Sequence, residues 1–136
     1  MRFRSLFKML LLLAIASSLA DLTLTLLGFS MFLEYWEINP YVRFLMLFLN
    51  PYLAVAVVSS ITLASATAGY VLARGCLGTY PYSGSLRDVA KYLWDSENVR
   101  ASDLSIFALT AFYAYLTYIH VTGALSWIML FLKIAR

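Results

Sequence analysis

Three long apolar stretches, separated by short polar segments, dominate the chain. They cover residues 9–33, 51–73 and 104–134. Because roughly 20 apolar residues cross the hydrocarbon core of a bilayer, each stretch is long enough to span a membrane as a helix. The third exceeds one perpendicular crossing by about ten residues, so it must tilt, project from the bilayer or break near Thr122-Gly123. The pattern predicts an all-α integral membrane bundle of three long transmembrane helices, or of four if that break occurs.

Two shorter segments are expected to form interfacial helices. The first covers about residues 40–49, where Asn39 followed by Pro40 is typical of a helix start. The second covers about residues 85–95, where apolar residues recur with helical spacing at Leu86, Val89, Ala90, Leu93 and Trp94. Such a helix either lies on the membrane surface or on the base of the protein, or only connects two spans.

The N-terminus combines features of a signal peptide and of a first span. Arg2, Arg4 and Lys8 precede an apolar run, and Ser18-Leu19-Ala20 resembles a signal peptidase site. The apolar run nevertheless continues to Leu33, whereas the apolar region of a signal peptide has only about 7–15 residues. We therefore expect an uncleaved first helix.

Small residues are concentrated in the second stretch. They are Ala54, Ala56, Ser59, Ser60, Ala64, Ser65, Ala66, Ala68 and Gly69. Small side chains let helix backbones approach one another closely in membranes. We expect this helix to be the central and most buried one.

Composition supports a membrane location for the whole chain. The 136 residues are 62% hydrophobic and 12% charged, with a mean hydropathy of +0.81. Little of the chain remains for a soluble domain, so one membrane domain over residues 1–136 is expected. The net charge is only +3 and the basic residues flank the spans, a distribution that argues against nucleic-acid binding.

The distribution of lysine and arginine predicts the orientation. Seven of these residues lie in the N-terminal arm and in the loop 74–100, namely Arg2, Arg4, Lys8, Arg74, Arg87, Lys91 and Arg100. Only Arg43, Lys133 and Arg136 lie on the other side. The positive-inside rule then places the N-terminus in the cytoplasm of a multi-pass protein of the cell membrane.

Cysteine and amide usage add little. Cys76 is the only cysteine, so neither an intrachain disulfide nor a cysteine metal cluster can form. The chain has no glutamine, and its only asparagines are Asn39, Asn50 and Asn98. This scarcity fits a heat-adapted source, but it also fits the low amide content of membrane proteins.

Asp21 is the only charged residue of the first stretch, and a carboxyl within a membrane is a functional-site hypothesis by default. Helical spacing places Ser17, Asp21, Thr25 and Gly28 on one face. Comparable faces on the other helices carry Ser59, Thr62, Ala66 and Gly69, and then Tyr113, Thr117, His120, Ala124 and Trp127. If these faces converge, Asp21 has three classes of partner: hydroxyls of the second helix, Tyr113 or Thr117, and His120.

Two roles for Asp21 remain open. The commoner one is a hydrogen bond that fixes the register of two helices, and the other is handling a proton, an ion or a substrate. A lone histidine such as His120 is more often a packing residue than a metal ligand, so no metal site is expected. Glu34 and Glu37 are expected to stay hydrated at the interface as topology and capping residues.

Sequence signatures of enzymes are missing. The chain contains no Gly-x-Ser-x-Gly elbow, no His-Glu-x-x-His, no phosphate-binding loop and no haem-type histidine pair. We expect neither catalytic residues nor a cofactor.

The first half of the chain resembles a known family. The run from Asp21 to Thr25, followed by Glu34 and by Glu37-Ile38-Asn39-Pro40, is similar to the pattern of the DUF5658 family of small prokaryotic membrane proteins, whose function is unknown. The resemblance implies that Asp21, Thr25, Glu37, Asn39 and Pro40 are characteristic positions. It also implies a lysine in the second span, where this chain has none. It indicates an architecture and no activity.

Three functions follow as hypotheses. The leading one is a non-enzymatic accessory or stabilising subunit of a larger membrane complex, partnered by lipids and by other subunits or by further copies of itself. Its basis is the small size, the small-residue second helix and an excess of aromatic residues in the third span, namely Phe107, Phe112, Tyr113, Tyr115 and Tyr118. The alternatives are a small transporter or proton-handling module that uses Asp21 and His120, and a lipid-binding or lipid-modifying protein.

Overall fold

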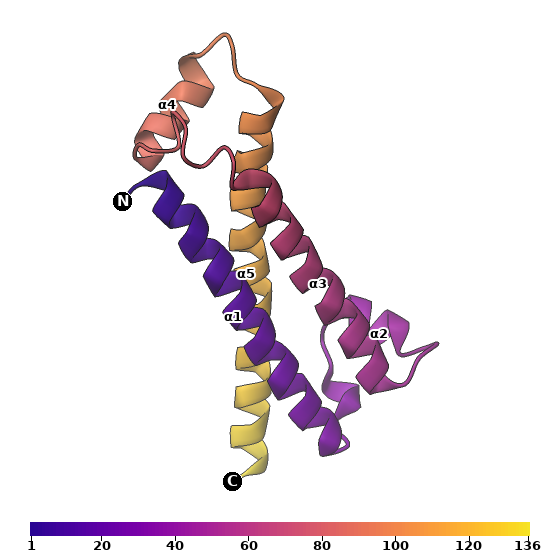
Figure 1. Ribbon diagram of the computed structural model, residues 1–136. Coiled ribbons are helices and arrows are strands. Elements are labelled where there is room, and N and C mark those ends of the chain that lie inside the picture. The colour runs from indigo at the N-terminus through magenta and orange to yellow at the C-terminus, as the bar shows by residue number, and fades with distance from the viewer.

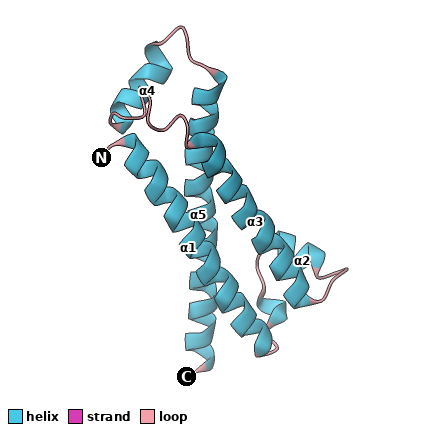
Figure 2. Ribbon diagram, in the orientation of Figure 1, coloured by secondary structure: helices cyan, strands magenta, loops and turns pink.

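The protein consists of helices joined by loops (Figures 1 and 2). A computed structural model describes residues 1–136, except for the side chain of Tyr35. In chain order the elements are α1 (Phe3–Ser30), the 3-10 helix η1 (Glu34–Trp36), α2 (Pro40–Leu45), α3 (Pro51–Ala73), α4 (Leu86–Asp95) and α5 (Ala101–Ile134). Within this described part no strand occurs, so the predicted all-α fold class is confirmed.

Three of these helices are long and apolar enough to cross a membrane. They are α1 with 28 residues, α3 with 23 and α5 with 34. The N-terminus, α4 and the start of α5 lie at one end of the bundle, while η1, α2 and the C-terminus lie towards the other (Figure 1). The chain is therefore a multi-pass membrane protein.

The third span does not break. α5 continues through Thr122 and Gly123 to Ile134, so the four-span alternative is wrong. A single glycine inside a helix costs only about 1 kcal/mol relative to alanine, which packing against α1 can offset. The extra length of α5 extends it along the whole bundle.

The two short helices begin where the sequence predicts. The side chain of Asn39 caps α2, and Ser85 forms a capping box with Asp88 at the start of α4. α2 ends at Leu45 instead of near residue 49, because the chain then tightens into turns in which the amide of Leu47 donates to the carbonyl of Phe44.

The main helix contact is between α1 and α5, and the expectation that α3 is the most buried helix is wrong. In the most apolar 18-residue stretch of each helix, 17% is buried for α3, against 22% for α1 and 28% for α5. Ala66 and Gly69 of α3 face the bundle, whereas Ala64 and Ala68 are exposed. The small residues are spread around α3, and only those on one face of the helix pack against the bundle.

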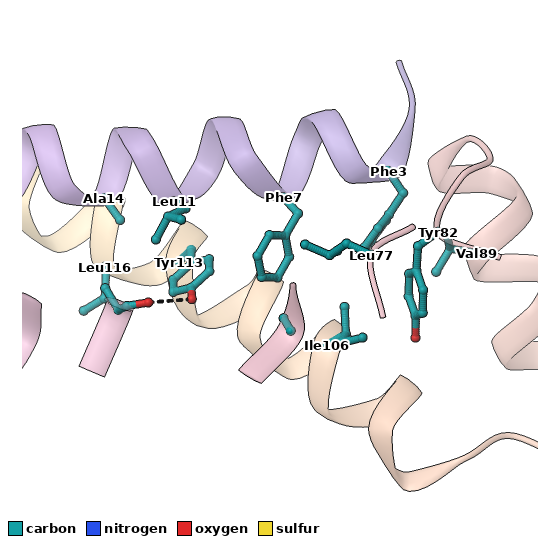
Figure 3. Close-up of a cluster of buried hydrophobic side chains, with 12 residues drawn as sticks. Phe3, Phe7, Leu11, Ala14, Leu77, Tyr82, Val89, Ile106, Tyr113 and Leu116 are labelled. Atoms are coloured by element: carbon teal, nitrogen blue, oxygen red, sulfur yellow. Dashed lines mark hydrogen bonds between the residues drawn. The ribbon is translucent and has the colours of Figure 1, made fainter. Parts of the chain in front are cut away.

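A first buried cluster holds the N-terminal end of the bundle together (Figure 3). Phe3 and Phe7 are fully buried, which explains why α1 starts at Phe3 instead of near residue 9. Phe7 packs edge-on against Tyr113, with ring centroids 5.2 Å apart. The Tyr113 hydroxyl donates to the Ala66 carbonyl at 2.8 Å and so links α5 to α3.

A second cluster lies towards the other end. It consists of Phe29, Val42, Ala54, Val55 and Trp127, contributed by α1, α2, α3 and α5. The polar residues around Asp21 lie between the two clusters along α1, so an apolar layer separates them from each end of the bundle.

Asp103, which the sequence did not single out, anchors the loop 74–100 to α5. Its fully buried carboxylate accepts hydrogen bonds from the hydroxyls of Tyr82 and Tyr92, both at 2.9 Å. It also accepts from the side chain of Arg100 at 3.2 Å. Burial, together with the bond to Asp103, raises the pKa of Tyr82, so this hydroxyl stays protonated as a donor.

We predict that Asp103→Asn destabilises the protein by about 2 kcal/mol, because an amide cannot accept from three donors at once and has no charge to pair with Arg100. The free energy of unfolding in mixed micelles measures this. Asp95→Asn, at an exposed position of α4, is the matched control and should change it by less than about 0.5 kcal/mol. Equal stability of both variants would contradict the assignment of Asp103 as an anchor.

Candidate functional site

Asp21 of α1 and His120 of α5 form a part-buried pair. The Nδ1 atom of His120 lies 2.8 Å from the Oδ2 atom of Asp21. Their side chains are 7% exposed for His120 and 15% for Asp21. The two atoms are therefore within hydrogen-bond distance, in a region from which water is largely excluded.

Gly123 makes the approach of the two helices possible. A Cβ atom at this position would lie 2.5 Å from Oδ1 of Asp21, closer than real Cβ atoms approach other heavy atoms. The glycine that the sequence suggested as a break point is therefore the contact surface for the carboxylate. Gly28 has the same role one layer further on, where the ring of Trp127 packs directly on its backbone.

Tyr113 and Thr117 are not partners of Asp21. Tyr113 donates to the Ala66 carbonyl, and the hydroxyl of Thr117 donates to the carbonyl of Tyr113 at 2.8 Å within its own helix. Of the partner classes left open by the sequence, the structure brings His120 to Asp21.

Glu37 is buried, and the expectation that it stays hydrated at the interface is wrong. It is 4% exposed, and its Oε1 atom accepts a hydrogen bond from the backbone amide of Asn39 at 2.7 Å. The connection between α1 and α3 folds back onto the bundle instead of staying in the interface. Glu34, by contrast, is partly exposed at the start of η1.

A tight reversal at the end of α1 directs Glu37 inwards. Phe32 adopts a left-handed backbone with φ 60°, and the amide of Leu33 donates to the carbonyl of Gly28. This hydrogen bond, with a left-handed residue just after the helix, is a common way for a helix to end, and glycine usually occupies the left-handed position. It turns the chain sharply enough for the residues after η1 to reach the side of α1 and α3.

A small polar cavity joins these residues. Its volume is about 20 Å³, room for about one water molecule. The polar lining residues are Asp21, Thr25, Glu37, Asn39, Ser59 and His120, and the apolar ones are Leu22, Val42, Val55 and Val58. Residues from α1, α2, α3, α5 and the connection before α2 therefore converge on one water-sized space.

The electrostatics of the cavity oppose a charge on Glu37. Burial raises the pKa of its carboxyl, and the nearby carboxyl of Asp21 raises it further, while the hydrogen bond from Asn39 lowers it. Glu37 is also left with one unsatisfied atom, because no described residue donates to its Oε2. A carboxyl in this setting keeps its proton to a higher pH than an exposed one does.

One further buried polar residue lies near the site on α1. Ser18, one turn before Asp21, is 2% exposed, and its hydroxyl has no hydrogen-bond partner among the described residues. Among all the described residues, no group of three or more His, Cys, Asp or Glu side chains could hold a metal ion. The set around the cavity is therefore unlike a zinc centre.

The raised pKa of Glu37 predicts a pH dependence of stability. The folded protein holds this proton more tightly than the unfolded chain, whose glutamate has a pKa of 4.5. The resulting stabilisation is fully present below that value and is lost as the pH rises through the folded pKa. We expect thermal melts from pH 4 upwards to show this decline in the wild type and a flatter profile in Glu37→Gln. Glu34→Gln is the control and should keep the wild-type slope; identical slopes in the wild type and Glu37→Gln would refute the prediction.

Comparisons of the chain with protein-family models, with curated proteins and with solved structures found no match. The resemblance of its first half to the DUF5658 family therefore stays a prediction. The site is assigned from its geometry alone.

Proposed function

We propose that this protein is a small membrane module that binds and releases protons at the Asp21–His120 pair. The observation that carries the proposal is the 2.8 Å contact between an aspartate and the single histidine of the chain. Intramembrane acidic residues and histidines that pair in this way mark proton relays in membrane proteins. The buried carboxyl of Glu37 beside the pair supports the same function.

The pair can change its charge by one proton. With a single proton between Nδ1 and the carboxylate, Asp21 and His120 together carry one negative charge. A second proton, bound at Nε2 of His120, gives an imidazolium and a carboxylate whose charges cancel.

Proton access is proposed from the side of the connection between α1 and α3. Asp21 lies nine residues before the end of α1 at Ser30, a distance of roughly 14 Å along the axis. Glu37 lies in the connection that follows and lines the same cavity. The lysine and arginine distribution predicts that the N-terminus lies on the cytoplasmic side of the cell membrane. The connection between α1 and α3 then lies on the outer side.

Reconstitution into proteoliposomes with an internal pH-sensitive dye tests the function. We predict that an imposed proton gradient collapses through the wild type, and that Asp21→Asn slows this flux by about a hundredfold, because an amide has no charge to stabilise the imidazolium that forms when His120 takes up a proton. Glu97→Gln, at an exposed position between α4 and α5, is the control and should match the wild type. Equal flux through the wild type, Asp21→Asn and empty liposomes would overturn the proposal.

A second candidate function is a non-enzymatic subunit of a larger membrane complex, as the size of the chain suggests. The observation that favours it is an open, nearly flat face of α3 that consists of Leu63, Ala64, Thr67, Ala68, Val71 and Leu72. Small side chains on the open face of a membrane helix suit close packing against another helix.

Native mass spectrometry of the protein, extracted in mild detergent from its own membrane, tests this second candidate. Reproducible protein partners of defined stoichiometry are the expected result. A monomer that carries one lipid per chain would instead support the lipid-binding hypothesis, and a bare monomer would exclude both.

A further inference from the structure

Glu37, which lines the cavity beside Asp21 and His120, has a carboxylate oxygen that no described residue satisfies. Glu37 is only 4% exposed, and its Oε2 atom lacks a partner, although Oε1 is bound by the amide of Asn39. Buried polar atoms are almost always hydrogen-bonded or charge-compensated. This oxygen therefore requires a proton, a water molecule or a cation.

The lining of the cavity favours a cation. Besides Glu37, it presents the carboxylate of Asp21, the hydroxyls of Thr25 and Ser59, and Asn39. Oxygen atoms of this kind are the ligands that hard cations prefer. They come from α1, from α3 and from the connection before α2, so together they can surround a small ion.

The geometry points to a binding site for one small monovalent cation, sodium or lithium, held between the carboxylates of Asp21 and Glu37 and the hydroxyls of Thr25 and Ser59. This inference rests on the proposed proton-binding function and deepens it, because it names the ion that exchanges with the proton. The cation neutralises Glu37 where a proton would otherwise do so.

Size and the number of available ligands restrict the cation to this class. A cavity of about 20 Å³ accommodates one ion no larger than a water molecule, without further waters. Magnesium keeps several waters and calcium takes six to eight oxygens, so both need more space and more ligands than this cavity offers. A monovalent ion without its hydration shell needs only a few protein oxygens, as in the midplane sites of secondary transporters.

Competition with protons follows from the charges that face Glu37. Asp21 on α1 opposes its ionisation, Arg43 on α2 favours it, and His120 on α5 lines the same cavity. Binding of one cation to ionised Glu37 requires the loss of the proton that the carboxyl otherwise holds. By linkage, the apparent cation affinity should then fall about tenfold for each pH unit below the folded pKa of Glu37.

Thermal melts of the full chain in detergent test the site. The probes are sodium, lithium, potassium and choline chloride, each titrated at constant ionic strength and at several pH values. We expect saturable stabilisation by sodium and lithium, weaker or no stabilisation by potassium, and none by choline. The half-saturating sodium concentration should rise about tenfold per pH unit on the acidic side.

Two variants assign the effect to the cavity. Glu37→Gln preserves the shape of the side chain and should abolish the sodium response, whereas Ser59→Ala should weaken it. Glu34→Gln, in the same connection, should respond like the wild type. Identical melts in sodium and choline, or an undiminished sodium response in Glu37→Gln, would overturn the cation site. Proton flux measured in sodium-free liposomes is a separate readout, so failure of the cation site and failure of the proton function can be told apart.

Discussion

The fold depends on how the carboxyl of Asp21 is accommodated within the membrane. An unpaired charge at this depth costs several kcal/mol, so the carboxyl needs a partner from another helix. His120 provides it at 2.8 Å, and the absence of a side chain at Gly123 lets the two helices approach closely enough. The extensive contact between α1 and α5 and the unbroken path of α5 are both consistent with this one requirement.

Two apolar clusters isolate this polar layer from the ends of the bundle. Phe7 and Tyr113 belong to the cluster on the N-terminal side, and Phe29 and Trp127 belong to the cluster on the other side. Because both clusters draw residues from α1 and α5, they fix the register of the two helices on either side of the polar layer. The connection before α2 is the exception, since it carries Glu37 into the layer. On that side of the bundle, exchange with water is therefore expected through that connection.

Much of the architecture could be predicted from the sequence, because membrane spans are set by length and apolar composition. The range of α3 and the asparagine caps before Pro40 and Pro51 follow from local patterns of this kind. Asp21 and His120 could be recognised as rare residue types on inward faces. Their pairing was one of several alternatives, because helical periodicity assigns a face to each residue and leaves the alignment of two helices undetermined.

The missed features depend on contacts between distant parts of the chain. Glu37 lies in a sequence segment that is typical of a membrane interface. Only the reversal at Phe32 turns its side chain into the bundle. In the sequence, Asp103 resembles an ordinary acidic residue in the first turn of a helix. Only the structure shows that Tyr82 and Tyr92, from the segment 74–100, donate hydrogen bonds to it. The small residues of α3 misled the prediction of its burial, because their number does not indicate which of them face the bundle.

Nitrogen-15 NMR of the ring of His120 tests the pairing of Asp21 with His120 most directly. The chain has one histidine, so its labelled ring gives a single, unambiguous pair of signals. If Nδ1 shares a proton with Asp21, the Nδ1 signal should indicate a strong hydrogen bond in the wild type and shift markedly in Asp21→Asn. An Nδ1 signal that is the same in both proteins would show that the two side chains are not paired, and it would contradict a proton-binding site at Asp21 and His120.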